Sequence, residues 1–218
     1  MPTHPNHPAP SLRERKKEKF RQLLINTAIE LFRERGFTHT RMEDIAAVAE
    51  SGVTTVYNYF PNKHTLLIAI IENQVALAQE AVSQVVNALP EDPREAFVDM
   101  IAADYGDMDT LEDKRLWREL LAAMLFAVEE HAQIGQARNR FKASLKLAIE
   151  AYVARGTFAA SVDIEALIDV VYAIYAFHFR SLACSDTALT ADTLILVRRD
   201  IRLLLSGLTS GDRQGRAG

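Results

Sequence analysis

The side chains with the clearest potential for chemistry lie in one short segment, residues 37–63, FTHTRMEDIAAVAESGVTTVYNYFPNK. Hydroxyls, an amide and aromatic rings gather in its second half, on Thr54, Thr55, Tyr57, Asn58 and Tyr59. Methyl groups suit the thymine edge in the major groove of DNA, and a carboxamide suits adenine. A rigid helix carrying these groups on one side could therefore read double-stranded DNA.

The local chemistry of this segment predicts a short first helix. Thr40 and Glu43 have the spacing of a capping box, in which a hydroxyl and a carboxylate each satisfy a free amide at a helix start. We therefore expect this helix to begin near Arg41. Its inward side should carry the apolar residues spaced three and four apart, Met42, Ile45, Ala46 and Ala49.

A second short helix is predicted after a tight bend at residues 50–52, Glu-Ser-Gly. It should run from Val53 to about Tyr59 and stop at Pro61, whose ring removes an amide donor and disfavours helical geometry in the preceding residue. Val56 and Phe60 should be buried. The residues left wholly or partly outward are then Val53, Thr54, Thr55, Tyr57 and Asn58.

Three groups of residues together resemble the tetracycline-repressor (TetR) family of bacterial transcription regulators. They are residues 31–37 (LFRERGF), then Thr40, Ile45 and Ala46, then residues 55–63 (TVYNYFPNK), in the order and spacing of the family pattern. The bend departs from that pattern, because the family usually has Gly, a small apolar residue and then Ser or Thr. Here Glu50 brings a carboxylate near DNA phosphates and Ser51 buries less apolar surface than Val, so the turn and the DNA affinity should be affected.

The resemblance implies a set of DNA-binding residues. Lys63, Tyr57, Thr40 and Arg41 are the phosphate-contact candidates, and Val53, Thr54, Thr55 and Asn58 the base-facing ones; Tyr59 completes the set. The base-facing residues include no Arg or Lys, the usual readers of guanine, so we expect mainly A·T pairs to be read. Recognition of G·C would come from Arg41 or Glu43, although Glu43 has its capping role as an alternative.

The expected fold class is all-α, with an N-terminal three-helix helix-turn-helix domain followed by a larger helical ligand-binding and dimerisation domain. We expect a disordered tail at 1–12, the DNA-binding domain at 13–62, the effector-binding and dimerisation domain at 63–210 and a second disordered tail at 211–218. Residues 1–63 carry a net charge of +3 and residues 64–218 a net charge of −7, which suits a domain that meets phosphate joined to one that does not.

The basic run at residues 13–21 lies at the start of the first long helix, beside the DNA backbone by the resemblance or at a solvated helix end. The lone Cys184 excludes an internal disulfide, and we expect it buried as a small apolar residue in a cytoplasmic protein. No secretory signal is predicted, and the apolar stretch 170–179 is short for a membrane span. We expect no metal, no cofactor and no membrane partner.

The last two predicted helices run to about Leu182 and to about Leu205, with Asp163 and Thr190 as their expected N-terminal caps. Both helices are apolar around much of their circumference. The resemblance implies that they form a homodimer interface, although they could instead be central to one monomer's core. Interior residues that combine apolar bulk with a polar tip are the candidates for an effector pocket: Tyr105, Trp117, Met124, Tyr152, Tyr175 and His178. Each could equally be core, and His178 could lie at the dimer interface.

The sequence therefore predicts a ligand-released homodimeric repressor that binds a palindromic operator in double-stranded DNA, with an apolar or aromatic small-molecule effector. The alternatives are a ligand-insensitive DNA-bridging protein and an enzyme. We expect no enzyme, because the chain has no Gly-rich phosphate loop, no G-x-S-x-G and no H-E-x-x-H.

Overall fold

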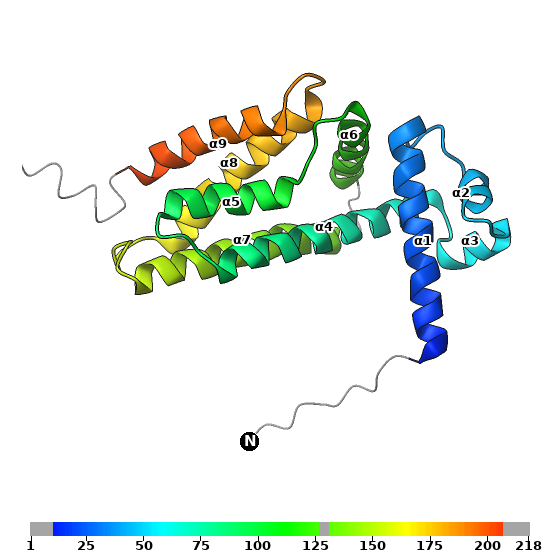
Figure 1. Ribbon diagram of the computed structural model, residues 1–218, viewed down its shortest axis with the longest axis horizontal. Helices are drawn as coiled ribbons and strands as arrows, with labels where there is room; N and C mark the ends of the chain where they lie inside the picture. The colour runs from blue at the N-terminus through cyan, green and yellow to red at the C-terminus, as the bar shows by residue number, and fades with distance from the viewer. Residues whose placement is uncertain (1–10, 127–130, 207–218) are drawn as a thin grey trace, which may run out of the picture. The chain divides into compact units, whose positions relative to one another are not determined.

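A computed structural model describes residues 11–126 and 131–206. Within these ranges, the side chains of residues 123–138 are not described. These residues form nine α-helices and no strand, which confirms the all-α class (Figure 1). The helices are α1 (Leu12–Arg35), α2 (Met42–Val48), α3 (Val53–Tyr59), α4 (Lys63–Asn87), α5 (Pro93–Tyr105), α6 (Leu111–Phe126), α7 (His131–Ala154), α8 (Ile164–Cys184) and α9 (Thr190–Leu205). Of the two tails predicted at 1–12 and 211–218, residues 1–10 and 211–218 lie outside the described residues.

The chain divides into two compact units, an N-terminal unit, Met1–Ile70, and a C-terminal unit, Ile71–Gly218. The division falls within α4, eight residues after the boundary expected at residue 62. Each unit has its own buried apolar residues, so each is described by itself.

The N-terminal unit packs α1 against α2, and α2 against α3 (Figure 1). Its core draws on every helix: Leu24, Ile25, Ala28, Leu31 and Phe32 from α1, Met42, Ile45 and Ala46 from α2, Val56 from α3, and Leu66, Leu67 and Ile70 from α4. Both short helices of the sequence analysis are confirmed within one residue of their expected starts. Asn62 caps α4 as its position before Lys63 suggests, because its Oδ1 accepts from the Thr65 amide at 2.8 Å.

The start of α1 was missed. Ser11 and Glu14 form a capping box in which the Glu14 amide donates to the Ser11 hydroxyl at 3.2 Å and the Ser11 amide donates to the Glu14 carboxylate at 2.6 Å. Helix α1 therefore begins at Leu12, inside the stretch expected to be a tail.

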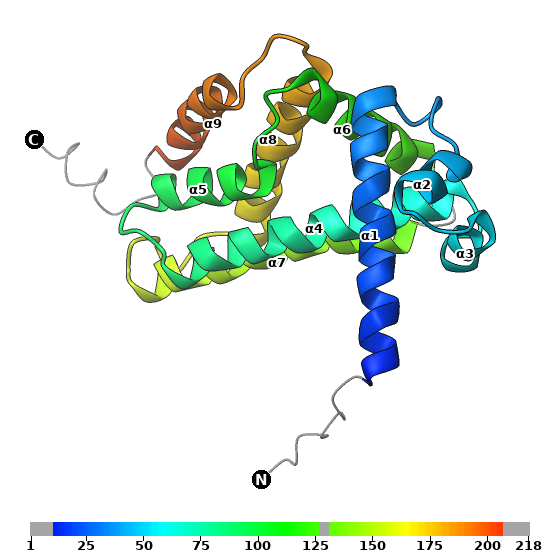
Figure 2. The same cartoon turned by 45° about the vertical axis from the view of Figure 1, so that its right-hand side comes forward.

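In the C-terminal unit, α5 and α8 are the central helices. Helix α5 packs against α7, α8 and α9, and α8 packs against α6, α7 and α9 (Figure 2). One apolar core joins them, with Phe97, Met100, Ile101, Leu145, Ile149, Val171, Leu182, Val197 and Ile201 among its fully buried members. The last two helices are thus each half buried within one chain, and each also keeps an outward side.

Polar contacts join the helices of this unit at its edges. Lys142 and Lys146 on α7 pair with Asp169 and Glu165 on α8 at 2.5 and 3.0 Å. Arg198 on α9 pairs with Glu95 on α5. The expected cap at Asp163 is confirmed, since its carboxylate accepts from the Ala166 amide at 3.0 Å.

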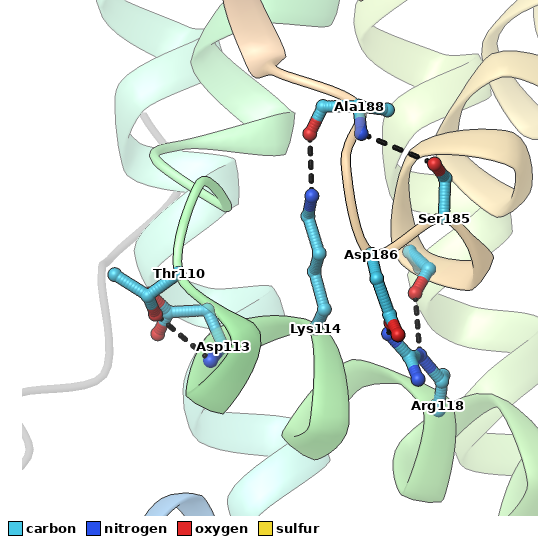
Figure 3. Close-up of polar contacts among 8 residues, drawn as sticks. Thr110, Asp113, Lys114, Arg118, Ser185, Asp186 and Ala188 are labelled. Atoms are coloured by element: carbon cyan, nitrogen blue, oxygen red, sulfur yellow. Dashed lines mark hydrogen bonds and ion pairs between the residues drawn. The ribbon is translucent and has the colours of Figure 1, made fainter.

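Helix α6 holds the connection between α8 and α9 (Figure 3). The side chain of Lys114 is fully buried, and its ammonium donates to the Ala188 carbonyl oxygen. One turn further along α6, the Arg118 Nε donates to the Ala183 carbonyl oxygen at 2.8 Å and its guanidinium pairs with Asp186. Two cations from one helix therefore bind the backbone and a carboxylate of one loop.

Two details of the C-terminal unit differ from the sequence expectations. Thr190 does not cap α9; Leu189 occupies that position, and the Thr190 hydroxyl accepts from the Met108 amide at 3.3 Å instead. Cys184 is exposed rather than buried, because the last turn of α8 faces solvent at that position.

By length and composition alone, α4 and α8 could each cross a membrane. The sequence analysis judged residues 170–179 too short for a membrane span, but these residues are only the most apolar part of α8, which has 21 residues. Core helices of globular proteins pass the same test, and α8 has the contacts of a core helix. It buries Leu167, Ile168 and Val171 within the C-terminal unit and carries Asp169, which is ion-paired with α7.

We predict that Lys114→Ala loosens the connection at residues 185–189. The change removes a buried aliphatic chain and leaves the Ala188 carbonyl oxygen without its charged donor, at a cost of about 2–4 kcal/mol in the free energy of unfolding. Hydrogen exchange should quicken at the Ala188 and Thr190 amides. Arg180→Ala, an exposed cation on α8, is the control; equal exchange in both variants would contradict the role of Lys114.

Candidate functional site

The outward side of α3 is made of the residues that the sequence singled out. Val56 is fully buried and Phe60, which follows the helix, is almost so. The side chains of Val53, Thr54, Thr55, Tyr57 and Asn58 are all exposed. A seven-residue helix is too short to be stable alone, so burial of the inward residues holds the outward ones in place.

Tyr59 packs α3 onto α1. Its ring lies edge to face against Phe20, with centroids 5.2 Å apart, and the residue is half buried. The ring of Tyr59 thus serves the packing of α3 against α1, and a contact of Tyr59 with DNA stays a prediction.

Thr40 faces inward. It is 1% exposed, and its hydroxyl lies 2.9 Å from the Gly36 carbonyl oxygen and 3.2 Å from that of Leu31. The predicted capping box of Thr40 with Glu43 is wrong. Arg41 is the N-cap residue of α2, and its amide donates to the Asp44 carboxylate at 2.8 Å. Thr40 ties the end of α1 to the start of α2 and offers no hydroxyl to a phosphate, whereas Arg41 remains exposed.

Lys63 also has a structural role. Its ammonium donates to the Phe37 carbonyl oxygen at 2.5 Å and to the Thr40 carbonyl oxygen at 3.0 Å, and it lies 4.2 Å from the centroid of the Phe37 ring. Phe37 in turn packs edge to face on Phe32, after Gly36 at φ 82° allows the chain to turn back. Lys63 therefore fastens α4 to the bend between α1 and α2.

The bend between α2 and α3 is strained. Glu50 has φ 50°, in the left-handed region that favours glycine, and it is the single described residue other than glycine with a positive φ. The Ser51 hydroxyl oxygen is buried and has no hydrogen-bond partner among the described residues. The two departures from the family pattern thus coincide with two local costs in the structure.

The geometry of this unit matches a known family. Residues 24–70 fit the sequence profile described as "Bacterial regulatory proteins, tetR family". A crystal structure of a TetR-family transcriptional regulator from Pectobacterium atrosepticum superposes with a TM-score of 0.70 and 27% identity, over 90% of this chain and 97% of that one. Residues 24–70 belong to the TetR family, and the chain has the fold of its members.

Two further proteins resemble this chain. The transcriptional repressor NicS of Pseudomonas putida is 29% identical over 91 residues, which are 42% of this chain and 42% of NicS. The match thus spans less than half the length of that curated relative. The structure of GusR from Salmonella enterica has a TM-score of 0.65 at 21% identity, over 87% of this chain and 95% of that one, and shares the fold.

Three effector candidates come together in the C-terminal unit. Tyr105 on α5 and Tyr175 on α8 have ring centroids 5.5 Å apart, and Trp117 on α6 lies 5.1 Å from Phe179. Phe179 lies 5.3 Å from Tyr105 and 5.9 Å from Tyr175, so it links the three. With Phe141 and Tyr172, these residues form the aromatic cluster: Tyr105, Trp117, Phe141, Tyr172, Tyr175 and Phe179.

The other candidates lie elsewhere. The Tyr152 hydroxyl donates to the Pro90 carbonyl oxygen at 2.7 Å, and its ring packs on Phe158. His178 is buried with its Nε2 2.8 Å from the Asp200 carboxylate on α9, so it joins two helices as a core histidine. The side chain of Met124 lies outside the described residues. Tyr152 and His178 are therefore not part of the aromatic cluster.

One polar group of the aromatic cluster was missed. Asp104, at the end of α5, accepts a hydrogen bond from the Tyr175 hydroxyl at 2.7 Å, and the Tyr105 hydroxyl donates to the Tyr175 carbonyl oxygen at the same distance. Burial raises the pKa of the Asp104 carboxyl to about 6, against the lowering effect of the Tyr175 hydroxyl. The spacing of Tyr172, Tyr175 and Phe179 on one helix side could have indicated the cluster, but nothing local indicated Asp104.

We predict that Glu50→Gly stabilises the N-terminal unit by about 1 kcal/mol, because glycine adopts the left-handed conformation without a Cβ clash. Glu50→Ala, which removes the charge and keeps the Cβ, should leave the stability nearly unchanged. Thermal unfolding of the three proteins compares them. If alanine stabilises as much as glycine, the cost at this bend is one of charge and not of backbone.

We predict that Lys63→Ala lowers the stability of the N-terminal unit by about 1–3 kcal/mol, because two carbonyl oxygens lose a charged donor and the Phe37 ring loses its cation. Lys19→Ala, on the exposed part of α1, is the matched control and should leave the unfolding temperature unchanged. An unchanged unfolding temperature for Lys63→Ala, with a salt dependence of DNA binding lowered by about one phosphate, would restore Lys63 as a phosphate contact.

Proposed function

We propose that this protein is a DNA-binding transcriptional repressor, a homodimer that binds a palindromic operator and is released by a small-molecule effector. The observation that carries the proposal is the outward side of α3, where a valine, two threonines, a tyrosine and an asparagine face solvent on a helix held by buried residues. The match of residues 24–70 to the TetR family supports it. We propose a cytoplasmic location, where a bacterial regulator would meet its DNA.

The charges around α3 suit a duplex. The basic run on α1 is exposed at Arg13, Arg15, Lys16, Lys17 and Lys19. Such a row of cations provides affinity for phosphate that is independent of sequence and weakens with salt. We assign the phosphate contacts to this run, to Arg41 and to the Tyr57 hydroxyl, and the base contacts to Val53, Thr54, Thr55 and Asn58.

The base-facing residues favour A·T pairs. Threonine and valine methyl groups contact the thymine methyl, and the Asn58 amide can both accept from and donate to adenine. We therefore propose that the operator half-site opposite α3 is rich in A·T pairs.

We predict that Thr54→Ala and Asn58→Ala each relax base preference at one position, at a cost of about 1–3 kcal/mol in binding the preferred operator. Lys19→Ala should instead weaken binding to all duplexes alike. Gel retardation with the operator and with single-base variants separates the two effects. Equal loss on all sequences for all three variants would contradict the assignment, and turnover of a metabolite without selective DNA binding would favour an enzyme.

The homodimer would form through α8 and α9. Their outward sides carry the outer stripe, five large apolar residues exposed to solvent: Val170, Phe177, Ile195, Leu196 and Leu203. Leu203 is 76% exposed and Phe177 60%, which is unusual for side chains of this size unless a partner covers them. A two-fold dimer would present two copies of α3, which must lie roughly 34–36 Å apart to enter successive major grooves.

We predict that Phe177→Glu prevents dimerisation, because it places a charge in the middle of an apolar interface. Sedimentation velocity should show a dimer for the unchanged protein and a monomer for the variant, whose operator affinity should fall. Leu147→Glu, an equally exposed apolar position on α7, is the control and should remain dimeric. A dimer that survives Phe177→Glu would place the interface elsewhere.

Release by an effector requires that the ligand bind one arrangement of the dimer better than the other, and a bias of a few kcal/mol suffices. We assign the effector to the aromatic cluster, because it combines six half-buried or buried aromatic side chains from α5, α6, α7 and α8 with the carboxylate of Asp104. Helix α6 contributes Trp117 to this cluster and also binds the α8–α9 connection through Lys114 and Arg118, so a ligand that moves α6 would act on both helices of the proposed interface.

A further inference from the structure

Asp104 is a carboxylate among aromatic rings, and it has no cation partner among the residues whose side chains the structure describes. It is half buried at the end of α5, and the Tyr175 hydroxyl is its one side-chain hydrogen-bond donor among the described residues. None of the described Lys or Arg side chains pairs with it. Burial raises the pKa of its carboxyl to about 6, because no described cation offsets the cost of the buried charge. The group is still ionised at neutral pH.

The rings beside it pack against one another, and the face of an aromatic ring attracts cations. Tyr175 stacks on Phe141 at 4.6 Å and on Phe179 at 5.9 Å, and Tyr105 lies against both Tyr175 and Phe179. One ring of the cluster already holds a cation, because the Lys142 ammonium lies 5.1 Å from the Tyr172 centroid. That ammonium is neutralised by Asp169 on the outer side, so it does not serve Asp104.

We propose that the aromatic cluster binds an organic cation, a protonated amine carried on an apolar or aromatic body, with the Asp104 carboxylate as its counter-ion. The inference rests on the proposed function, in which this cluster receives the effector, and names the chemical class of that effector. The Tyr175 hydroxyl holds the carboxylate in position, and the rings of Tyr175, Tyr105 and Trp117 cover the apolar body and the charge.

The same geometry disfavours neutral and anionic ligands. A neutral aromatic compound would desolvate the carboxylate further without supplying a partner, and an anion would be repelled by it. A cation both pairs with the carboxylate and meets ring faces, so its binding offsets the cost that the folded protein bears at Asp104.

The test uses three compounds of nearly equal size that differ in charge: phenethylammonium, phenethyl alcohol and phenylacetate. Trp117 is the sole tryptophan of the chain and lies in the cluster, so its fluorescence reports binding there directly. We expect the ammonium compound to bind the full-length protein at least about tenfold more tightly than the alcohol, and phenylacetate to bind most weakly.

Three variants locate the preference. Asp104→Asn should abolish the advantage of the cation over the alcohol while keeping the alcohol's own affinity. Asp99→Asn removes the same charge from an exposed position of the same helix and should retain the advantage. Tyr175→Phe, which keeps the ring, should retain part of it. Circular dichroism of each variant shows that the helices are intact.

The inference is overturned if the alcohol binds as tightly as the ammonium compound, if neither changes Trp117 fluorescence, or if Asp104→Asn leaves the advantage unchanged. Operator binding measured without any ligand separates this from the proposed function. Selective DNA binding with no cation preference would support the proposed repressor and contradict the organic-cation ligand. Cation binding without selective DNA binding would support the ligand and contradict the repressor.

Discussion

The N-terminal unit depends on the burial of one side of a helix that could not exist alone. Helix α3 has seven residues, fewer than an isolated helix needs in water, and its stability comes from Val56, Phe60 and the contact of Tyr59 with α1. The same packing determines which side chains face outward. Recognition of bases needs side chains held to fractions of an ångström, so the buried residues of α3 matter to specificity although they never meet a base.

The bends on either side of α2 are held by different means. Between α1 and α2, Thr40 and Lys63 satisfy the carbonyl oxygens of Leu31, Gly36, Phe37 and Thr40, so this bend is polar and well bonded. Between α2 and α3, Glu50 is left-handed and the Ser51 hydroxyl has no partner among the described residues. The bend that positions α3 is therefore the less stable of the two. Its cost comes from Glu50 and Ser51, the two residues that depart from the family pattern.

Among the described residues of the C-terminal unit, ion pairs join the helices at the edges, whereas one half-buried carboxylate, that of Asp104, has no cation partner. Lys142, Lys146 and Arg198 each have a carboxylate partner on a neighbouring helix, and Arg118 has one, Asp186, in the connection between α8 and α9. Asp104 has a tyrosine hydroxyl instead, within the aromatic cluster. Fold stability alone would favour a neutral residue there, since a carboxylate with a raised pKa costs free energy at neutral pH.

The sequence predicted the local elements well because their signals are local. Periodic apolar residues, the Asp163 cap and the break at Pro61 all act within a few residues, and each is found where expected. The Ser11-x-x-Glu14 box was equally readable and was overlooked. The roles of Thr40, Lys63 and Asp104 were not readable, because their partners lie 4 to 71 positions away and are chosen by packing.

The central claim is that the exposed side of α3, doubled by symmetry, reads a duplex by its bases. Selection of bound molecules from a pool of randomised duplexes, followed by sequencing, tests it most directly. The account predicts enrichment of an inverted repeat whose half-sites lie about one helical turn apart and are rich in A·T pairs. A pool that remains unenriched, or an enriched single site without two-fold symmetry, would contradict it.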